Sequence, residues 1–149
     1  MTTGSYTVDT VIPAPREIVY GVFADRERYG EFLPIQTRLQ QAGSTERQGI
    51  GAIHFLRLGP IGIKERITDL IAGELIDYEL VTKGLPVDHH FGTILFSDHP
   101  NGTRVLYTMD STPSVPMPRP LLVLGLRLFT SLLVSGARRQ AVRAAKVSV

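Results

Sequence analysis

Two proline-bounded segments near the N-terminus constrain most strongly how this chain folds. Pro13 and Pro15 end the alternating, β-branched stretch at residues 6–12, because proline cannot donate a hydrogen bond to a β-ladder. Between Pro15 and Pro34 the apolar residues recur at helical spacing. After Pro34, and as far as residue 112, the pattern favours strands. We therefore expect one strand, two short helices and then a long run of strands.

The first of these helices begins at Pro15, a residue that suits the first helical turn. Its buried stripe is predicted to consist of Ile18, Val19, Val22 and Phe23. Asp25 can cap a second, short helix that runs through Tyr29 and Phe32 and ends at Pro34.

Turn residues divide the region after the helices into short strands. The breakers are Gly59-Pro60, Gly73-Glu74, Gly84-Leu85-Pro86 and Pro100-Asn101-Gly102. With the first strand included, we expect seven strands at residues 6–12, 37–42, 51–58, 62–71, 75–83, 89–97 and 103–112. The connectors are too short for parallel crossovers, so successive strands should pair antiparallel.

One last helix is predicted from about residue 118 onward, after a proline-rich connector. Its inward stripe is predicted to be Leu122, Leu126, Phe129, Leu133, Ala137 and Ala141. The opposite face is also apolar, with Leu121, Val123, Leu124, Leu128, Leu132 and Val134. Such a helix is either covered on both faces or presents an apolar patch to a partner or a membrane.

Length and charge indicate one domain over residues 1–149, because 149 residues can build a core unaided. Sixteen Lys and Arg against fourteen Asp and Glu leave a net charge of only +2. The one cationic cluster, Arg138, Arg139, Arg143 and Lys146, stands where cations oppose the negative end of a helix dipole. We expect no nucleic-acid partner.

The absence of cysteine excludes disulfides and thiolate chemistry, and it fits a reducing compartment. The N-terminal residues show no basic-then-apolar signal pattern. The apolar stretch at residues 121–134 is shorter than the ~20 residues of a membrane span. A cytoplasmic location is therefore expected, with membrane contact possible but not expected.

Three stretches resemble one known superfamily. They are Ile12-Pro13-Ala14-Pro15 with Val19, then Asp25-Arg26-Glu27-Arg28-Tyr29 leading to Phe32-Leu33-Pro34, and Phe96 followed by Asn101-Gly102-Thr103-Arg104-Val105. With these residues in this order, the chain resembles the START-like superfamily, also called SRPBCC or polyketide cyclase/dehydrase. Residues 29–34 are also similar to its coenzyme Q-binding branch, whereas many other members carry Trp where Phe32 stands.

The resemblance implies an α+β helix-grip fold. Its elements are a seven-stranded curved antiparallel sheet, two short helices after the first strand, and a long C-terminal helix over the concave face. It also implies a cavity between the sheet and that helix, which the superfamily uses for sterols, lipids, polyketides, plant hormones or quinones. No single catalytic motif spans the superfamily, and no cofactor is expected, so function has to be argued from the lining.

The strand period of two predicts which residues line that cavity. The inward rows are Val105, Tyr107 and Met109; His90, Gly92, Ile94 and Phe96; Ile76, Tyr78, Leu80 and Thr82; and Ile63, Glu65, Ile67 and Asp69. The strand at residues 51–58 is ambiguous, and we favour His54 facing inward. The predicted ligand contacts are His54, Tyr78, His90, Ile94, Phe96, Tyr107, Met109, Leu122, Leu126, Phe129 and Leu133.

Two of these inward residues could act as a general base, namely His90 and Glu65. A histidine titrates near neutral pH, and a carboxylate between apolar neighbours loses hydration. Each also has a structural interpretation, His90 as a hydrogen-bonded group and Glu65 as a partnered group at the surface or mouth. No metal site is expected, because the neighbours His89 and His90 point to opposite faces of one strand.

Three functions fit these predictions. The leading one is the binding, transport or sequestration of a lipid, polyketide or isoprenoid oriented by Tyr78, Tyr107 and His90. The second is a cyclase or dehydrase in which His90 or Glu65 abstracts a proton and a tyrosine stabilises the enolate oxygen. The third is a quinone-binding or interaction module that uses the apolar last helix, including a homodimer through that helix. Whether the protein is an enzyme stays open at this stage.

Overall fold

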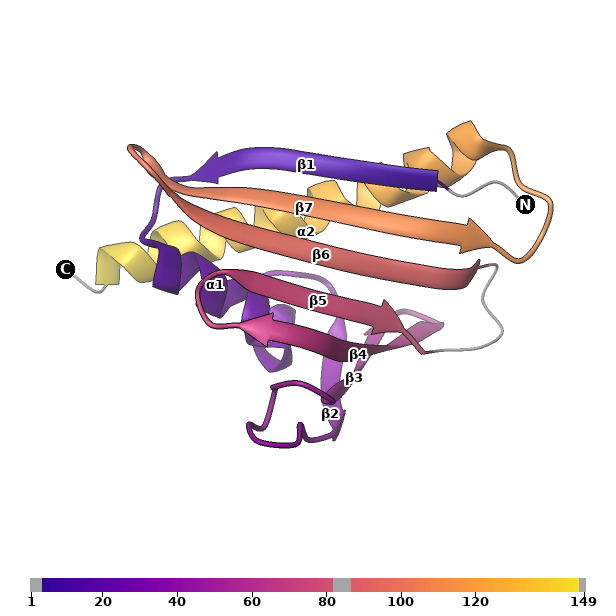
Figure 1. Ribbon diagram of the computed structural model, residues 1–149, viewed down its shortest axis with the longest axis horizontal. Helices are drawn as coiled ribbons and strands as arrows, with labels where there is room; N and C mark the ends of the chain where they lie inside the picture. Colours follow the sequence, from indigo (N-terminus) through magenta and orange to yellow (C-terminus); the bar gives the residue numbers. More distant parts are fainter. Residues whose placement is uncertain (1–3, 82–86, 148–149) are drawn as a thin grey trace.

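The computed structural model describes residues 4–81 and 87–147, with the backbone alone at residues 87 and 88. One antiparallel sheet contains β1 (Gly4–Ile12), β2 (Gln36–Gln41), β3 (Ile53–Leu58), β4 (Ile61–Ile71), β5 (Leu75–Leu80), β6 (Val87–His99) and β7 (Gly102–Pro113). Its seven strands lie in the order β1-β7-β6-β5-β4-β3-β2 (Figure 1). The predicted antiparallel sheet is confirmed.

Two short helices follow β1, as predicted. They are α1 (Arg16–Ala24) and the 3-10 helix η1 (Arg26–Glu31), and the last helix is α2 (Arg119–Val147). The helix-grip fold is therefore confirmed, with element ends that differ by a few residues. The predicted end of β5 at residues 82 and 83, and the predicted turn at residues 84–86, lie outside the described residues.

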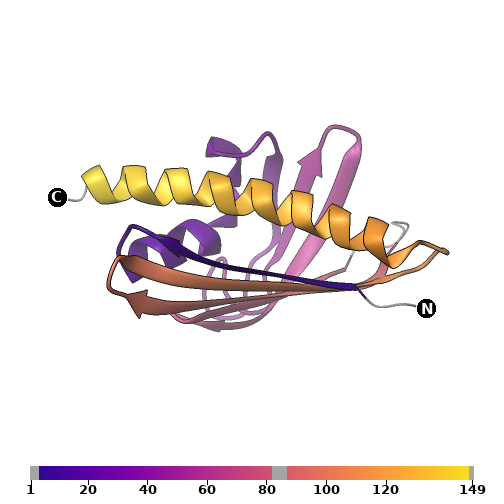
Figure 2. The same cartoon turned by 90° about the horizontal axis from the view of Figure 1, so that it is seen from above.

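The helix α2 runs along one face of the sheet, and the strands at the β2 end turn up beside it (Figure 2). Its C-terminal half packs on β1, α1 and the end of η1. Gly136 makes this close approach possible, because a Cβ there would meet Phe32 at 2.8 Å. A larger residue at position 136 would push the helix away from η1.

An apolar cluster fills the interior beneath α1. We define it by Ile12, Val19, Phe23, Phe96 and Val105, which are all buried. The rings of Phe23 and Phe96 are 5.7 Å apart between centroids. This apolar cluster fixes α1 on the sheet and so fixes the position of η1, which follows it directly.

The predicted inward row on β4, which ran from Ile63 to Asp69, is wrong at its last residue. Asp69 is exposed, and Leu70 packs against the core instead. The cause is a bulge, because Ile67 pairs with Tyr78 whereas Asp69 pairs with the next residue, Asp77. The extra residue reverses the facing of all later positions in β4.

The predicted inward stripe of α2 also needs one correction. Leu122, Leu126, Leu133, Ala137 and Ala141 are buried as predicted. Phe129, however, is 41% exposed, and Thr130 takes the buried position. Thr130 can do so because its hydroxyl donates to the carbonyl of Leu126 at 2.6 Å. Phe129 therefore lies on the flank of the stripe.

Candidate functional site

A group of polar side chains lies inside the otherwise apolar interior, between η1 and the centre of the sheet. We define the polar cluster as Arg26, Glu65, Tyr78 and Tyr107. All four residues are 1–3% exposed. They come from η1, β4, β5 and β7, so the cluster depends on the complete fold.

An ion pair forms the charged part of the polar cluster. Arg26 Nη1 donates to Glu65 Oε1 at 2.6 Å, and both side chains are almost completely buried. The Arg26 guanidinium also lies 4.5 Å from the centre of the Tyr78 ring. Burial by itself would lower the pKa of Arg26, but Glu65 opposes this and the pKa ends above its usual value. Arg26 is therefore charged.

The 3-10 geometry of η1 explains why Arg26 points inward. In such a helix residues i and i+3 eclipse one another, so Arg26 shares a face with Tyr29. Tyr29 is buried, and its hydroxyl donates to the carbonyl of Phe23 at 2.5 Å. Because Tyr29 is fixed in this way, the η1 face that carries Arg26 is directed at the sheet.

A pair of tyrosines forms the neutral part of the polar cluster. The hydroxyls of Tyr78 and Tyr107 are hydrogen-bonded to each other. The ring of Tyr78 occupies the space above Gly92, where any Cβ would overlap it. Burial raises the pKa of Tyr78 and of Tyr107 above the usual value, so both hydroxyls keep their protons.

One hydroxyl hydrogen of the tyrosine pair is not used by the bond between the two side chains. Two hydroxyls carry two hydrogens, and the bond between them uses one. Among the described residues, the bond between the two hydroxyls is the only hydrogen bond that either of them makes. Arg26 Nε is likewise buried without a partner. Buried donors are normally satisfied, so the polar cluster suits a molecule that brings an acceptor such as a carbonyl oxygen.

His90 borders the polar cluster near one end of β6. Its ring centre is 6.2 Å from that of Tyr78, and its Nδ1 is hydrogen-bonded to the hydroxyl of Ser111. Burial lowers the pKa of His90, against a smaller opposing effect of Glu65. The imidazole is therefore neutral at pH 7. It is also the one partly exposed polar side chain beside the cluster in the described part of β6.

His54 lies on the other side of the ion pair and faces inward, as favoured from the sequence. Its Nε2 is 3.0 Å from Gln48 Oε1, and Gln48 Nε2 donates to Asp25 Oδ1 at 2.8 Å. Burial, followed by the charge of Arg26, lowers the pKa of His54 to about 4. His54 thus supports the position of η1 as a neutral side chain.

Comparison with known proteins identifies the family. A family model described as "Polyketide cyclase / dehydrase and lipid transport" matches residues 3–147. The chain belongs to this family. A search of curated proteins finds no match.

Solved structures of other proteins show the same fold. A START superfamily protein from Mycobacterium smegmatis matches with a TM-score of 0.78 and 15% identity, covering 95% of this chain and 98% of that one. The Zhui aromatase/cyclase from Streptomyces sp. R1128 matches at 0.72 and 15%, covering 97% and 94%. The structure of Ara h 8.0201 matches with a TM-score of 0.77 and 8% identity, covering 95% of this chain and 99% of that one. At these identities the likeness shows the fold alone.

In this family member, the predicted ligand contacts on the sheet are buried in the interior, except for His90, which is partly exposed. His54, Tyr78, Ile94, Phe96, Tyr107 and Met109 are buried. From α2, Leu122, Leu126 and Leu133 are buried and Phe129 is exposed. The structure brings Glu65 to the polar cluster, but it pairs this carboxylate with Arg26. Their roles in ligand binding stay predictions.

The expected hollow is not open at the centre of the sheet. Tyr78, Ile94, Tyr107 and Met109 are only 0–2% exposed, so side chains cover them almost completely. Partly exposed inward positions occur at one end of the sheet, at Ile63, Leu80 and His90. A ligand that reaches the polar cluster has to displace side chains, and this end is where the interior meets solvent.

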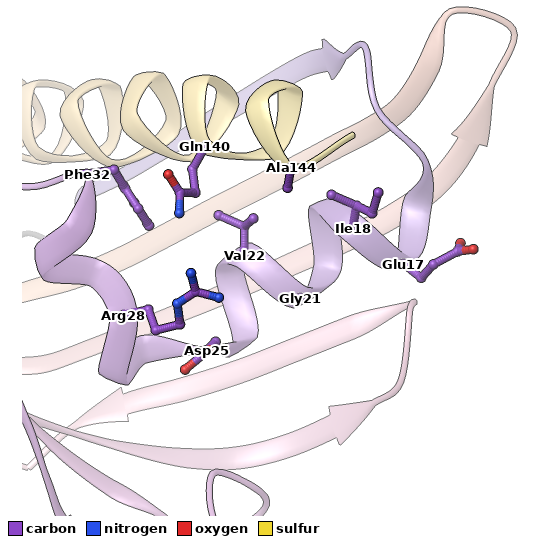
Figure 3. Close-up of a pocket in the computed structure, with 9 residues that line it drawn as sticks. All are labelled: Glu17, Ile18, Gly21, Val22, Asp25, Arg28, Phe32, Gln140 and Ala144. Atoms are coloured by element: carbon purple, nitrogen blue, oxygen red, sulfur yellow. The ribbon is translucent and has the colours of Figure 1, made fainter. Parts of the chain in front are cut away.

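A groove on the outside of the molecule is a separate feature. It lies between α1, η1 and α2, encloses about 280 Å³, and is lined by Glu17, Ile18, Gly21, Val22, Asp25, Arg28, Phe32, Gln140 and Ala144 (Figure 3). Its polar groups are largely paired within the protein, since Arg28 bonds Glu31 and Asp25 bonds Gln48. Gln140 Oε1, in the same groove, is buried without a partner, so the groove offers an unmet acceptor whereas the polar cluster offers unmet donors.

Sequence reasoning missed Arg26, Gln48 and Ser111. Arg26 was visible in principle, because a buried Glu65 demands a cation and Arg26 precedes the apolar Tyr29 by three residues. Gln48 and Ser111 carried no comparable signal. Among the described residues, no group of three or more His, Cys, Asp or Glu is placed to hold a metal ion.

Proposed function

We propose that the protein binds a hydrophobic small molecule that carries a carbonyl or hydroxyl oxygen. The observation that carries this proposal is the unmet donor capacity of the polar cluster, at the tyrosine pair and at Arg26 Nε. Ligand sites are mainly apolar with a few converging polar groups, and the surrounding side chains fit that description. Membership of a family described by polyketide and lipid chemistry agrees with this ligand class.

The ligand enters, in this proposal, beneath the N-terminal half of α2. That half rests on the sheet through few buried side chains, among them Leu122, Leu126 and Thr130. His90, which is partly exposed, borders the same end, and Phe129 on this half of the helix is exposed. Moving this half of the helix would open the polar cluster without disturbing the apolar cluster beneath α1.

Isothermal titration tests the ligand class. The probes are a hydroxyanthraquinone, oleate and ubiquinone-1, with glucose as the polar control. We expect at least one apolar probe to bind with micromolar affinity, and Tyr78→Phe/Tyr107→Phe to weaken a carbonyl-bearing probe about tenfold, the worth of one hydrogen bond. Gly21→Leu is the matched control, because its side chain would project into the outer groove. Binding lost in Gly21→Leu alone would place the ligand in that groove instead.

A disulfide staple tests the entry route. The chain has no cysteine, and a Cβ at Gly4 would lie 2.7 Å from the Leu122 side chain. Gly4→Cys/Leu122→Cys should therefore tether α2 to β1 when oxidised. We expect the oxidised form to bind the probe much more slowly and the reduced form to regain the original rate. Equal rates in both forms would exclude movement of this half of α2 as the entry step.

A proton-transfer reaction is the second candidate, favoured by the neutral His90 beside Tyr78. His90 would take a proton from a carbon next to a carbonyl, and the spare tyrosine hydrogen would stabilise the enolate oxygen. Glu65 is the weaker base candidate, because it is bonded to Arg26. Deuterium exchange into a bound 1,3-diketone should slow sharply in His90→Gln. Exchange no faster than in buffer would leave binding as the sole function.

A further inference from the structure

The N-terminal half of α2 carries an apolar stripe on the side facing away from the sheet. At 100° per residue, Leu121, Leu124, Leu128 and Leu132 lie on one face, opposite Leu126. These four leucines are 57, 48, 62 and 44% exposed. We call them the leucine stripe. Single exposed leucines are ordinary, but four in one row on one helix mark a surface that contacts something apolar.

The charges of α2 are all of one sign. The helix contains six Arg and Lys residues and no Asp or Glu. Arg138 is used within the protein, where it donates to the carbonyl of Val11 at 2.9 Å. Arg139, Arg143 and Lys146 continue along or beside the line of the leucine stripe, and in the described part of the chain no carboxylate pairs with any of them.

We propose that this face of α2 docks on the surface of an anionic phospholipid bilayer. The leucine stripe would enter the boundary between headgroups and acyl chains, while the cations beyond it would meet lipid phosphates. Interfacial helices combine an apolar row with cations in this way, and a helix that itself carries no carboxylate complements negative lipids. This proposal does not depend on the function proposed above.

Two other arrangements fit less well. The helix α2 is long and apolar enough to span a bilayer, but 39% of its most apolar window is buried against the rest of the protein. Spanning would remove Leu126 and Leu133 from the core. A dimer through the leucine stripe would bring two helices together that carry positive charge and no negative charge. Docking on a bilayer surface neither removes leucines from the core nor brings two positively charged helices together.

Vesicle sedimentation with the full chain tests the docking. The probes are vesicles of phosphatidylcholine alone and of phosphatidylcholine mixed with phosphatidylglycerol. We expect binding to the mixed vesicles and little to the neutral ones, with affinity falling as salt is added. Leu124→Ser/Leu128→Ser should weaken binding at least about tenfold, and Arg139→Glu/Arg143→Glu should weaken binding to the anionic vesicles only.

Leu95→Ser is the matched control, since Leu95 is a similarly exposed leucine on the strand β6. All variants change exposed side chains, and a thermal unfolding curve like that of the original protein confirms that they fold. Unchanged binding in Leu124→Ser/Leu128→Ser, or no binding of the original protein to anionic vesicles, would overturn the proposal. Sedimentation as a dimer that these two substitutions separate would identify a second copy as the occupant instead.

Discussion

The apolar cluster beneath α1 and the polar cluster beside it are equally buried but are held together differently. The apolar cluster gains free energy from every side chain it removes from water, so its residues contribute one by one. The polar cluster contains two charges, and removing each ion from water costs several kcal/mol, which the attraction between the two charges only partly or just offsets. The difference indicates that the apolar cluster maintains the fold, and it agrees with the proposal that the polar cluster is retained for ligand binding.

The largest effect is expected for Arg26→Met. This change leaves Glu65 buried without its cation, so the free energy of unfolding should fall by about 3–5 kcal/mol in a urea titration. Arg26→Met/Glu65→Leu should regain most of that loss, because a buried ion pair can be replaced by apolar residues at little cost. A double variant as unstable as the single one would show that the pair itself stabilises the fold, which would remove the contrast between the clusters.

Phe23→Ala tests the apolar cluster by the same titration. Removing a buried phenylalanine should also cost about 3–5 kcal/mol, and no second substitution nearby should restore it. Binding of an apolar probe by the surviving folded protein should keep its affinity, since Phe23 contacts the ring of Tyr107, at 6.3 Å between centroids, and supplies no polar group to the unmet donors. A stronger effect on affinity than on stability would mean that the ligand extends under α1.

His54 predicts how stability depends on pH. Its pKa in the folded protein is about 4, below the ordinary value of 6.5, so the folded state favours the neutral ring. His54 therefore contributes roughly 3 kcal/mol to the free energy of unfolding. This contribution is complete above pH 6.5 and is lost as the pH falls toward 4. The charges facing the ring are Arg26 and Glu27. The difference in unfolding free energy between the original protein and His54→Gln should therefore shrink or reverse over this range. A constant difference would contradict the assignment.

Tyr78→Phe should have a smaller effect, of about 1–3 kcal/mol, because it deprives the Tyr107 hydroxyl of its buried partner. Tyr78→Phe/Tyr107→Phe should recover part of this loss in thermal unfolding while losing affinity for a carbonyl-bearing probe. Full affinity in the double variant would separate the tyrosine pair from ligand binding.

The smallest effect is expected at the surface. Arg104 and Asp9 form an ion pair of 2.7 Å on the strands β7 and β1, and both are about half exposed. Asp9→Asn should change the unfolding free energy by less than about 1 kcal/mol, since water and salt screen such pairs. A loss comparable to that of Arg26→Met would mean that burial does not decide the strength of ion pairs in this protein.

The sequence was sufficient for the fold because the fold depends on local signals. Proline positions, glycine turns and the period of two located the strands and helices of the described chain to within a few residues. The bulge at Thr68 was not visible, because an extra residue in a strand leaves no trace in a short alternating pattern. It reversed the predicted facing of Asp69.

The site was less predictable because its contacts are distant in sequence. Arg26 and Glu65 are 39 positions apart, and an arginine between acidic residues reads as exposed. His54 was ambiguous because both faces of its strand are apolar. The structure resolves this by covering Phe55 on the outer face with Arg38, whose guanidinium is 5.4 Å from the ring centre. Phe129 was placed inward because threonine is a less obvious core residue than phenylalanine.

Gly92 makes the tyrosine pair possible and so links two positions on neighbouring strands. Because the Tyr78 ring fills the room that any larger residue at position 92 would need, the two sites can change only together. In a set of related chains, alanine or valine at the first should accompany a small side chain at the second. The presence of glycine opposite tyrosine would then identify, among many relatives, those that have room for the same buried tyrosine pair.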